Sequence, residues 1–117
     1  MTEQQEQIKF VNWCKLNKIF VFSIPNGGTR NKVEATNMKR EGLLKGATDL
    51  IVMLNVIVFI EFKVAPKVLK NGKLSYSNSK TSDEQIKFMN RVDTFDYAES
   101  FIAYGYDDAI KNIMEYL

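Results

Sequence analysis

The chain contains no histidine at all, and this absence removes several kinds of catalytic site. A serine or cysteine nucleophile activated by histidine, a histidine general base and a histidine-ligated zinc site are all excluded. Cysteine is nearly absent as well, because Cys14 is the only one. It can form neither an internal disulfide nor a zinc site on its own, and we expect it to be buried as a small apolar side chain. Any hydrolytic chemistry must therefore rest on carboxylates, lysines and a hard metal ion.

Long hydrophobic runs are also missing, and no apolar stretch reaches the roughly 18 residues that a membrane helix needs. The start, MTEQQEQIKF, has neither the basic end nor the apolar centre of a signal peptide. We therefore expect the protein to stay where it is made, in the cytoplasm. With 45% apolar and 26% charged residues, the 117-residue chain predicts one folded domain, residues 1–117, rather than a disordered segment.

The net charge of +2 hides an uneven distribution of charge. Residues 24–82 hold ten Lys and Arg against four Asp and Glu, whereas residues 83–117 hold three against eight. The basic middle is either a solvated lysine-rich face or a surface that binds phosphate groups. Charge alone leaves both interpretations open.

Hydrophobic periodicity predicts alternating helices and strands. Helices are expected at residues 3–17, 32–42, 82–95 and 107–117, and strands at 19–24, 49–54, 57–63 and 100–104. Gly42 is expected to close the second helix and Ser82 to cap the third. The Asn71-Gly72 pair is a strong signal for a tight hairpin turn. This order predicts an α/β fold with a mixed central β-sheet flanked by helices on both faces.

The two central strands carry charged residues within the most hydrophobic part of the chain. A three-residue turn centred on Asn55 places Asp49 opposite Glu61, because the two are equally far from the turn. Lys63 shares the face of Glu61, since side chains alternate along a strand. Two close carboxylates repel unless a cation lies between them, and oxygen ligands alone favour Mg²⁺, with Mn²⁺ as a substitute. The alternative is a structural ion cluster in which Lys63 neutralises the two acids.

These residues resemble a known signature. Gly46-Ala-Thr-Asp49, eleven further residues and Glu61-Phe-Lys63 are similar to the motif of the PD-(D/E)XK nucleases. Flanking motifs narrow the resemblance to the VRR-NUC (virus-type replication and repair nuclease) branch, in a minimal stand-alone form. In chain order they are Glu3-x-x-x-Gln7, Trp13, Pro25-Asn26-Gly27-Gly28-x-Arg30, Gly42-Leu-Leu-Lys-Gly46 and Ser82-x-x-Gln85. Thr48 departs from the pattern, which usually has proline before the aspartate, but that position shapes the backbone rather than binding metal.

The resemblance implies a restriction-endonuclease-like αβββαβ core and a metal-dependent DNA endonuclease. It implies that Lys63 orients the attacking water and that Gln85 positions Lys63 or that water. The residues alone leave open that Gln85 is an exposed helix residue and that Glu3 merely complements a helix N-terminus. The metal ligands implied by the resemblance are Asp49, Glu61, the main-chain carbonyl of Phe62, and Glu3.

The basic middle of the chain is expected to supply the DNA contacts, which position the phosphate backbone and read no sequence. The stretch Asn26-Gly27-Gly28 lacks the spacing of a glycine-rich nucleotide-binding motif, so an ATPase is disfavoured. The expected DNA-binding residues are Arg30, Lys32, Lys39, Arg40, Lys67, Lys70, Lys73 and Lys80.

The resemblance further implies a role in DNA repair on branched DNA such as four-way (Holliday) junctions, in a bacterial or phage-infected cell. Two symmetric cuts require two catalytic centres, which predicts a two-fold homodimer. Its interface is predicted in the acidic C-terminal third, unless the apolar residues there simply complete the core. Three other functions stay open, namely a monomeric flap or nicking nuclease, a non-catalytic DNA-binding module and a structural interaction protein. The predicted interface residues are Phe95, Tyr97, Phe101, Tyr104, Tyr106, Ile113, Met114 and Tyr116.

Overall fold

The computed structural model of the protein describes residues 1–25, 31–76 and 80–117. Each helix and strand predicted from the sequence is present, with ends shifted by a few residues at most, and the hairpin at Asn71-Gly72 adds two short strands. Within these ranges no helix is both long and apolar enough to cross a membrane. In chain order the elements are α1 (Glu3–Leu16), β1 (Phe20–Ser23), α2 (Lys32–Arg40), β2 (Leu50–Met53), β3 (Ile57–Lys63), β4 (Lys67–Val68), β5 (Leu74–Ser75), α3 (Asp83–Val92), β6 (Ala98–Tyr104) and α4 (Tyr106–Met114).

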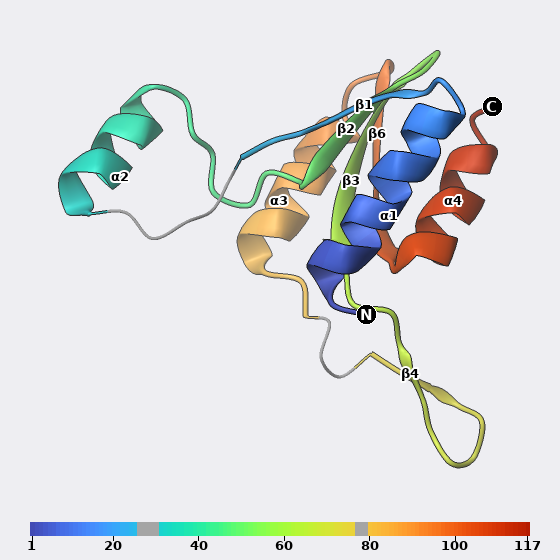
Figure 1. Cartoon of the computed structure of the whole chain (residues 1–117). Coiled ribbons are helices and arrows are strands. Elements are labelled where there is room, and N and C mark those ends of the chain that lie inside the picture. Colours follow the sequence, from blue (N-terminus) through green and yellow to red (C-terminus); the bar gives the residue numbers. More distant parts are fainter. Residues whose placement is uncertain (26–30, 77–79) are drawn as a thin grey trace.

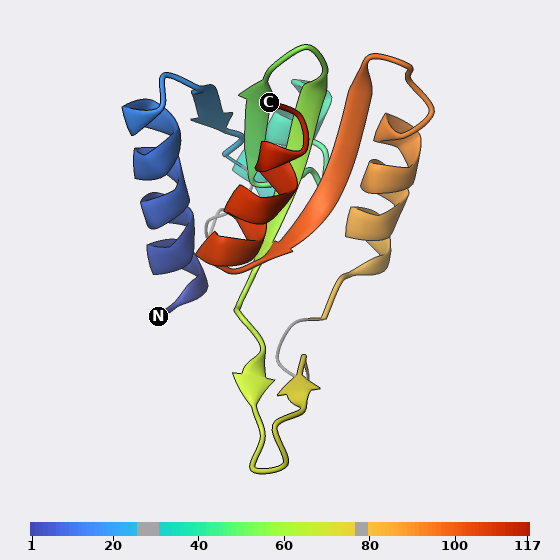
Figure 2. The same cartoon turned by 90° about the vertical axis from the view of Figure 1, so that its right-hand side faces the viewer.

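A mixed sheet with the strand order β1-β2-β3-β6 forms the centre of the molecule. The pairs β1–β2 and β2–β3 are antiparallel, whereas β3 and β6 are parallel. Met53 pairs with Ile57 and Ile51 with Phe59, which is the predicted register of the central hairpin. Helices α1 and α4 lie on one face of the sheet and α3 lies on the other (Figure 1 and Figure 2). The predicted fold class is therefore confirmed.

The main core lies between the sheet and helices α1 and α4. The inward side chains of β3 on this face are fully buried, and Phe62 packs on Phe10 of α1 with ring centroids 5.6 Å apart. Trp13 stacks on Phe10 from the same helix. Cys14 is also fully buried and free, as expected, and burial raises the pKa of its thiol to about 12. The carboxylate of Glu6, itself buried, accepts a hydrogen bond from the backbone N–H of Tyr106 and so ties α1 to the start of α4.

The opposite face of the sheet is less completely covered than the sequence predicts. Phe20 pairs with Met53 and Phe22 pairs with Ile51, so these side chains share the face on which α3 lies. Phe20 is nevertheless 64% exposed. Helix α3 packs against β6, at the far edge of the sheet, and α2 stands apart from the sheet altogether (Figure 1). Among the described residues, one helix alone therefore shields this face, and the part formed by β1 and β2 stays open.

Helix α2 has no buried residue. Its end is set by Gly42, whose φ of 112° suits glycine and whose N–H donates to the carbonyl of Lys39. Gly42 therefore closes the helix as predicted, and the chain then returns to the sheet through residues 43–49.

Candidate active site

Glu61 and Lys63 occupy alternate positions near the end of β3, on the face covered by α3. Both are buried, with 3% and 9% relative exposure, although they are charged residue types. The Lys63 Nζ lies 3.6 Å from Oε2 of Glu61. The strand thus places an acid and a lysine side by side in an interior position, where each needs a partner.

Asp49 reaches the same place from the start of β2. Its Oδ2 accepts a hydrogen bond of 2.7 Å from the backbone N–H of Phe62, the residue between Glu61 and Lys63. The β2–β3 register is the predicted one, and extending it by one residue sets Asp49 opposite Glu61. The structure therefore brings together the three residues that the sequence singled out.

Gln85 of α3 completes this cluster by bridging Glu61 and Lys63. Its Nε2 donates to Oε2 of Glu61 at 3.0 Å, and its Oε1 accepts from Nζ of Lys63 at 3.0 Å. The same Oε1 also accepts from the backbone N–H of Ser82, as one half of a capping box at the start of α3. Gln85 is half-buried, so the alternative of an exposed helix residue does not hold. The Gln85 side chain therefore both caps the start of α3 and holds the side chains of Glu61 and Lys63 in place.

The electrostatics of Glu61 show that the cluster lacks positive charge. Burial is the largest cause that raises the pKa of Glu61, and the charge of Asp49, a side-chain hydrogen bond with Asp49 and the charge of Glu3 act in the same direction. Lys63 lowers the pKa, and the net result of all these effects is a pKa of about 8. A structural ion cluster would hold its carboxylates ionised. The balance here favours a proton on Glu61 at neutral pH, which argues against the purely structural interpretation.

Glu3 approaches the site from the first turn of α1. Partial burial raises the pKa of Glu3, the charge of Asp49 raises it too, and Lys63 lowers it. Its carboxyl group is therefore within electrostatic reach of the cluster, and its place at the helix start also suits the N-terminal dipole. In the part of the chain that the structure describes, however, no group of three or more Asp, Glu, His or Cys side chains is arranged to hold a metal. The role of Glu3 as a metal ligand stays a prediction.

A second observation indicates that Asp49 and Glu61 could hold a hard cation. The Oε1 atom of Glu61 is buried and has no hydrogen-bond partner among the described residues. An unpaired buried oxygen of this carboxyl group is costly, and a divalent cation held with Asp49 would satisfy it after replacing the proton on Glu61. Ligands that are all oxygen match Mg²⁺ or Mn²⁺.

The segment before Asp49 explains part of the glycine pattern in the sequence. Gly46 has a φ of 92°, and a side-chain Cβ at this position would lie 2.5 Å from the backbone carbonyl carbon of Glu84. Only glycine allows the segment to pack against the first turn of α3, next to Gln85. Thr48 is buried, and its Oγ1 has no hydrogen-bond partner within the described ranges. The Gly42–Gly46 motif therefore sets the approach of Asp49 to the site.

The predicted DNA-binding residues form two separate groups. Lys32, Lys39 and Arg40 are exposed on α2, and the lysines of residues 67–80 are exposed around β4 and β5. These two parts extend from the body in different directions (Figure 1). Arg30 and the Asn26-Gly27-Gly28 stretch lie outside the described residues.

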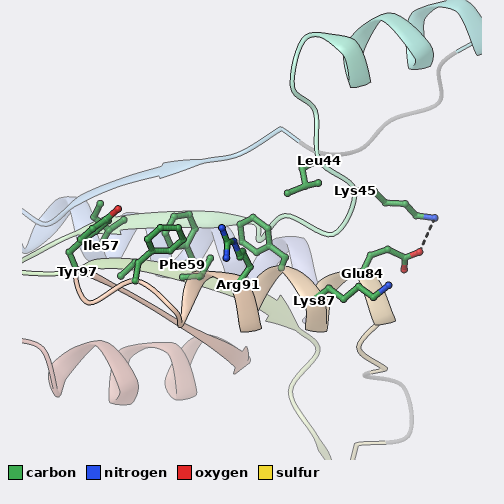
Figure 3. Close-up of a pocket in the computed structure, with 12 residues that line it drawn as sticks. Leu44, Lys45, Ile57, Phe59, Glu84, Lys87, Arg91 and Tyr97 are labelled. Carbon is green, nitrogen blue, oxygen red and sulfur yellow. Dashed lines mark ion pairs between the residues drawn. The ribbon is translucent and has the colours of Figure 1, made fainter.

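The structure also contains an apolar groove that the sequence reasoning missed. It has a volume of about 680 Å³ and runs between α3 and β3, with Phe59 of β3 and Phe88 of α3 in edge contact (Figure 3). Phe59 lies two residues before Glu61 on the same strand face, so the groove continues from the carboxylate site without including it. The alternation of side chains along β3 could have indicated the apolar strand face that lines the groove. The absence of a covering helix over β2 could not be predicted from the sequence. The apolar lining residues are Leu44, Ile57, Phe59, Phe88, Val92, Phe95, Tyr97 and Ala98.

The predicted C-terminal interface residues divide between core and surface. Ile113 is fully buried, and Phe101, Tyr106 and Tyr116 pack against the core, so the alternative of core completion holds for these four. Tyr104 packs edge-on against Tyr76. The exposed members are Phe95, Tyr97 and Met114.

Comparisons with known proteins support the fold. No family model and no curated protein matches the sequence. A solved structure named VRR_NUC domain protein is similar over 100% of this chain and 88% of its own, with a TM-score of 0.77 and 23% sequence identity. The chain therefore has the α/β fold of that VRR_NUC domain protein. This agreement confirms, at the level of the fold, the resemblance seen in the sequence.

Proposed function

We propose that the protein is a divalent-metal-dependent DNA endonuclease of the VRR-NUC type. The observation that carries the proposal is the convergence of Asp49, Glu61, Lys63 and Gln85 around a buried carboxylate oxygen that lacks a partner among the described residues. The similarity to a VRR_NUC domain protein supports a nuclease of the PD-(D/E)XK class. A fold used only for binding or assembly gains nothing from this arrangement.

The residues of the cluster divide the work between them. Asp49, Glu61 and the main-chain carbonyl of Phe62 would hold Mg²⁺ or Mn²⁺, with Glu3 acting through the outer shell. A bound ion of this kind polarises the phosphate and lowers the pKa of a nearby water. Lys63, held by its hydrogen bond to Gln85, orients the attacking water and stabilises charge that develops on the phosphate.

The substrate that fits the proposal is branched DNA, for example the four-way junction, handled during DNA repair in the cytoplasm of a bacterial or phage-infected cell. The exposed lysines and arginine of α2 and the lysines around β4 and β5 would contact phosphates. Because they extend in different directions, they suit a substrate with more than one DNA arm (Figure 1).

A two-fold homodimer would supply the second catalytic centre that symmetric cutting requires. The apolar groove beside α3, together with the open face of β1 and β2, is the surface best suited to a second copy. Only Phe95 and Tyr97 of the predicted C-terminal interface line this groove. Light scattering should give twice the monomer mass of 13.5 kDa. A monomer, free and on junction DNA, would favour a flap or nicking nuclease instead.

One assay tests the enzymatic part of the proposal. The purified protein is incubated with Mg²⁺ or Mn²⁺ and a panel of duplex, single-stranded, flap and four-way junction DNA. Lys63→Ala should abolish cleavage and leave DNA affinity within a few-fold, because the lysine acts mainly in the transition state. Lys111→Ala, at an exposed position of α4, is the matched control. Binding without cleavage by the unchanged protein under all conditions would indicate a non-catalytic DNA-binding module.

A further inference from the structure

A two-stranded arm, residues 67–75, extends from the body beyond the end of β3 (Figure 2). Lys67 pairs with Ser75 and Val68 with Leu74, and the turn between the strands is closed by two backbone hydrogen bonds. The N–H of Leu69 donates to the carbonyl of Lys73 at 2.8 Å, and Gly72, with a φ of 82°, donates to the carbonyl of Leu69 at 2.9 Å. We refer to residues 67–75 as the β4–β5 arm.

The charge of the arm has one sign only. No Asp or Glu occurs between Glu61 and Asp83, whereas Lys67, Lys70 and Lys73 all lie on the arm and are exposed. A projecting surface of this kind attracts a polyanion. Nucleic acid is the partner whose charge complements it.

The arm also exposes apolar side chains that phosphate binding does not explain. Val68 is 73% exposed, Leu74 is 53% exposed and Leu69 is 47% exposed. Val68 and Leu74 are a cross-strand pair, and such apolar pairs stabilise a hairpin. Their exposure is therefore partly explained by the folding of the arm. Leu69 lies in the turn, outside the strand pairing, and the hairpin needs only its backbone. About half of its side chain is open to solvent, and the strand pairing of the arm does not include it.

The base of the arm is held in a fixed direction relative to the candidate active site. Tyr76 packs edge-on against Tyr104 with ring centroids 4.9 Å apart. A Cβ on Gly105 would lie 2.9 Å from the Cβ of Ala65. The segment that leads into the arm therefore packs closely against the residue that follows β6. Only residues 64–66 separate the arm from Lys63. The base of the arm therefore lies next to the candidate active site.

We propose that Leu69 inserts at an interrupted base step of the DNA, while the lysines of the arm hold the flanking phosphates. The inference rests on the proposed nuclease function and names the feature of the substrate that the arm recognises. Apolar side chains that enter a base step must unstack it. This costs less where pairing or stacking is already broken, as at a branch point. Phosphate contacts alone cannot make that distinction, so Leu69 is the specificity-determining residue.

The test compares Leu69→Ser with two controls, Lys70→Ala on the same arm and Leu117→Ser at the exposed C-terminus. Binding is measured by fluorescence anisotropy with EDTA, so that cleavage plays no part. The DNAs are a four-way junction, with 2-aminopurine at its branch point, and a duplex of the same length. Leu69→Ser should lower the ratio of junction to duplex affinity about tenfold and remove the 2-aminopurine brightening seen with the unchanged protein. Lys70→Ala should weaken both complexes alike, and Leu117→Ser should change neither.

Several outcomes would overturn the inference. An unchanged affinity ratio and unchanged 2-aminopurine signal for Leu69→Ser would assign Leu69 to the turn alone. Equal loss of affinity for the junction and the duplex in Leu69→Ser would show that Leu69 contacts DNA without distinguishing its structure. A drop in the particle mass of DNA-free Leu69→Ser would assign the arm to contact with another copy of the chain. If the unchanged protein binds and cuts DNA without brightening, the insertion fails and the nuclease stands; if it neither binds nor cuts, both fail.

Discussion

Gln85 donates a 3.0 Å hydrogen bond to the carboxylate of Glu61 across 24 residues of sequence. Glu61 lies on the central strand and Gln85 in the first turn of α3, so this contact joins the sheet to the helix. The same amide accepts from Lys63 and from the backbone of Ser82. The start of α3 and the geometry of the site thus depend on one side chain, and the two roles can be separated by mutation.

Separating them requires two variants. Ser82→Ala removes the hydroxyl that caps α3 and leaves Gln85 in place, so it should lower the free energy of unfolding by about 1 kcal/mol with little effect on cleavage. Gln85→Ala removes the contacts to both Glu61 and Lys63 as well, and should reduce the cleavage rate far more than its effect on stability explains. Urea unfolding and single-turnover kinetics measure the two effects. Similar activities for the two variants would show that Gln85 is a helix cap only.

Metal binding should depend on Asp49. Asp49→Asn keeps an oxygen for the N–H of Phe62 and removes one negative ligand, so affinity for Mn²⁺ should fall by about tenfold or more. Calorimetric titration measures this affinity, with Asp107→Asn, at an exposed position of α4, as the control. Equal affinity in Asp49→Asn and the unchanged protein would place the metal elsewhere.

The stability of the metal-free protein should fall as the pH rises. Below the ordinary carboxyl pKa of 4.5, Glu61 holds its proton in the folded and unfolded chain alike. Between pH 4.5 and about 8 the unfolded chain ionises while the folded chain keeps the proton. Over this range the free energy of unfolding should therefore fall by at most about 1.4 kcal/mol per pH unit, and the loss should level off above it.

Glu61→Gln removes this titration and keeps an oxygen that can accept from Gln85. In EDTA it should be more stable than the unchanged protein at pH 8 and show little gain at pH 4.5, as measured by urea unfolding. Glu115→Gln, on the exposed last turn, is the control. A gain that does not vary with pH would mean that the buried carboxyl of Glu61 is not protonated in the folded state.

The two glycines of the motif before Asp49 should respond differently to alanine. Both have positive φ, so each substitution carries a backbone cost of about 1–2 kcal/mol. Gly42 has nothing within 4 Å of an added Cβ, whereas Gly46 faces the backbone of Glu84. Gly46→Ala should therefore cost at least about 1 kcal/mol more and displace the first turn of α3, with a loss of cleavage. Equal losses of stability would show that the segment does not pack on α3 as described.

Local pattern and strand geometry were enough to predict the centre of the site. The alternation of residues 57–63 and the three-residue turn at Asn55 fixed the register of β2 and β3, because strand pairing around a short turn leaves one arrangement that buries the apolar faces. The proximity of Asp49, Glu61 and Lys63 follows from that register. Ser82, as an N-cap residue, likewise predicted the start of α3.

The features that depend on long-range packing were visible only in the tertiary structure. Nothing local states that α3 lies over β6 and leaves β1 and β2 open, because both faces of the central strands are apolar in sequence. The buried Oε1 of Glu61 without a partner among the described residues, the bridge from Gln85 to Lys63, and the steric need for glycine at position 46 each depend on how α3 docks on the sheet. Sequence patterns report which face of an element is apolar; the docking of whole elements decides which of those faces is covered, since burial is a property of the assembled layers.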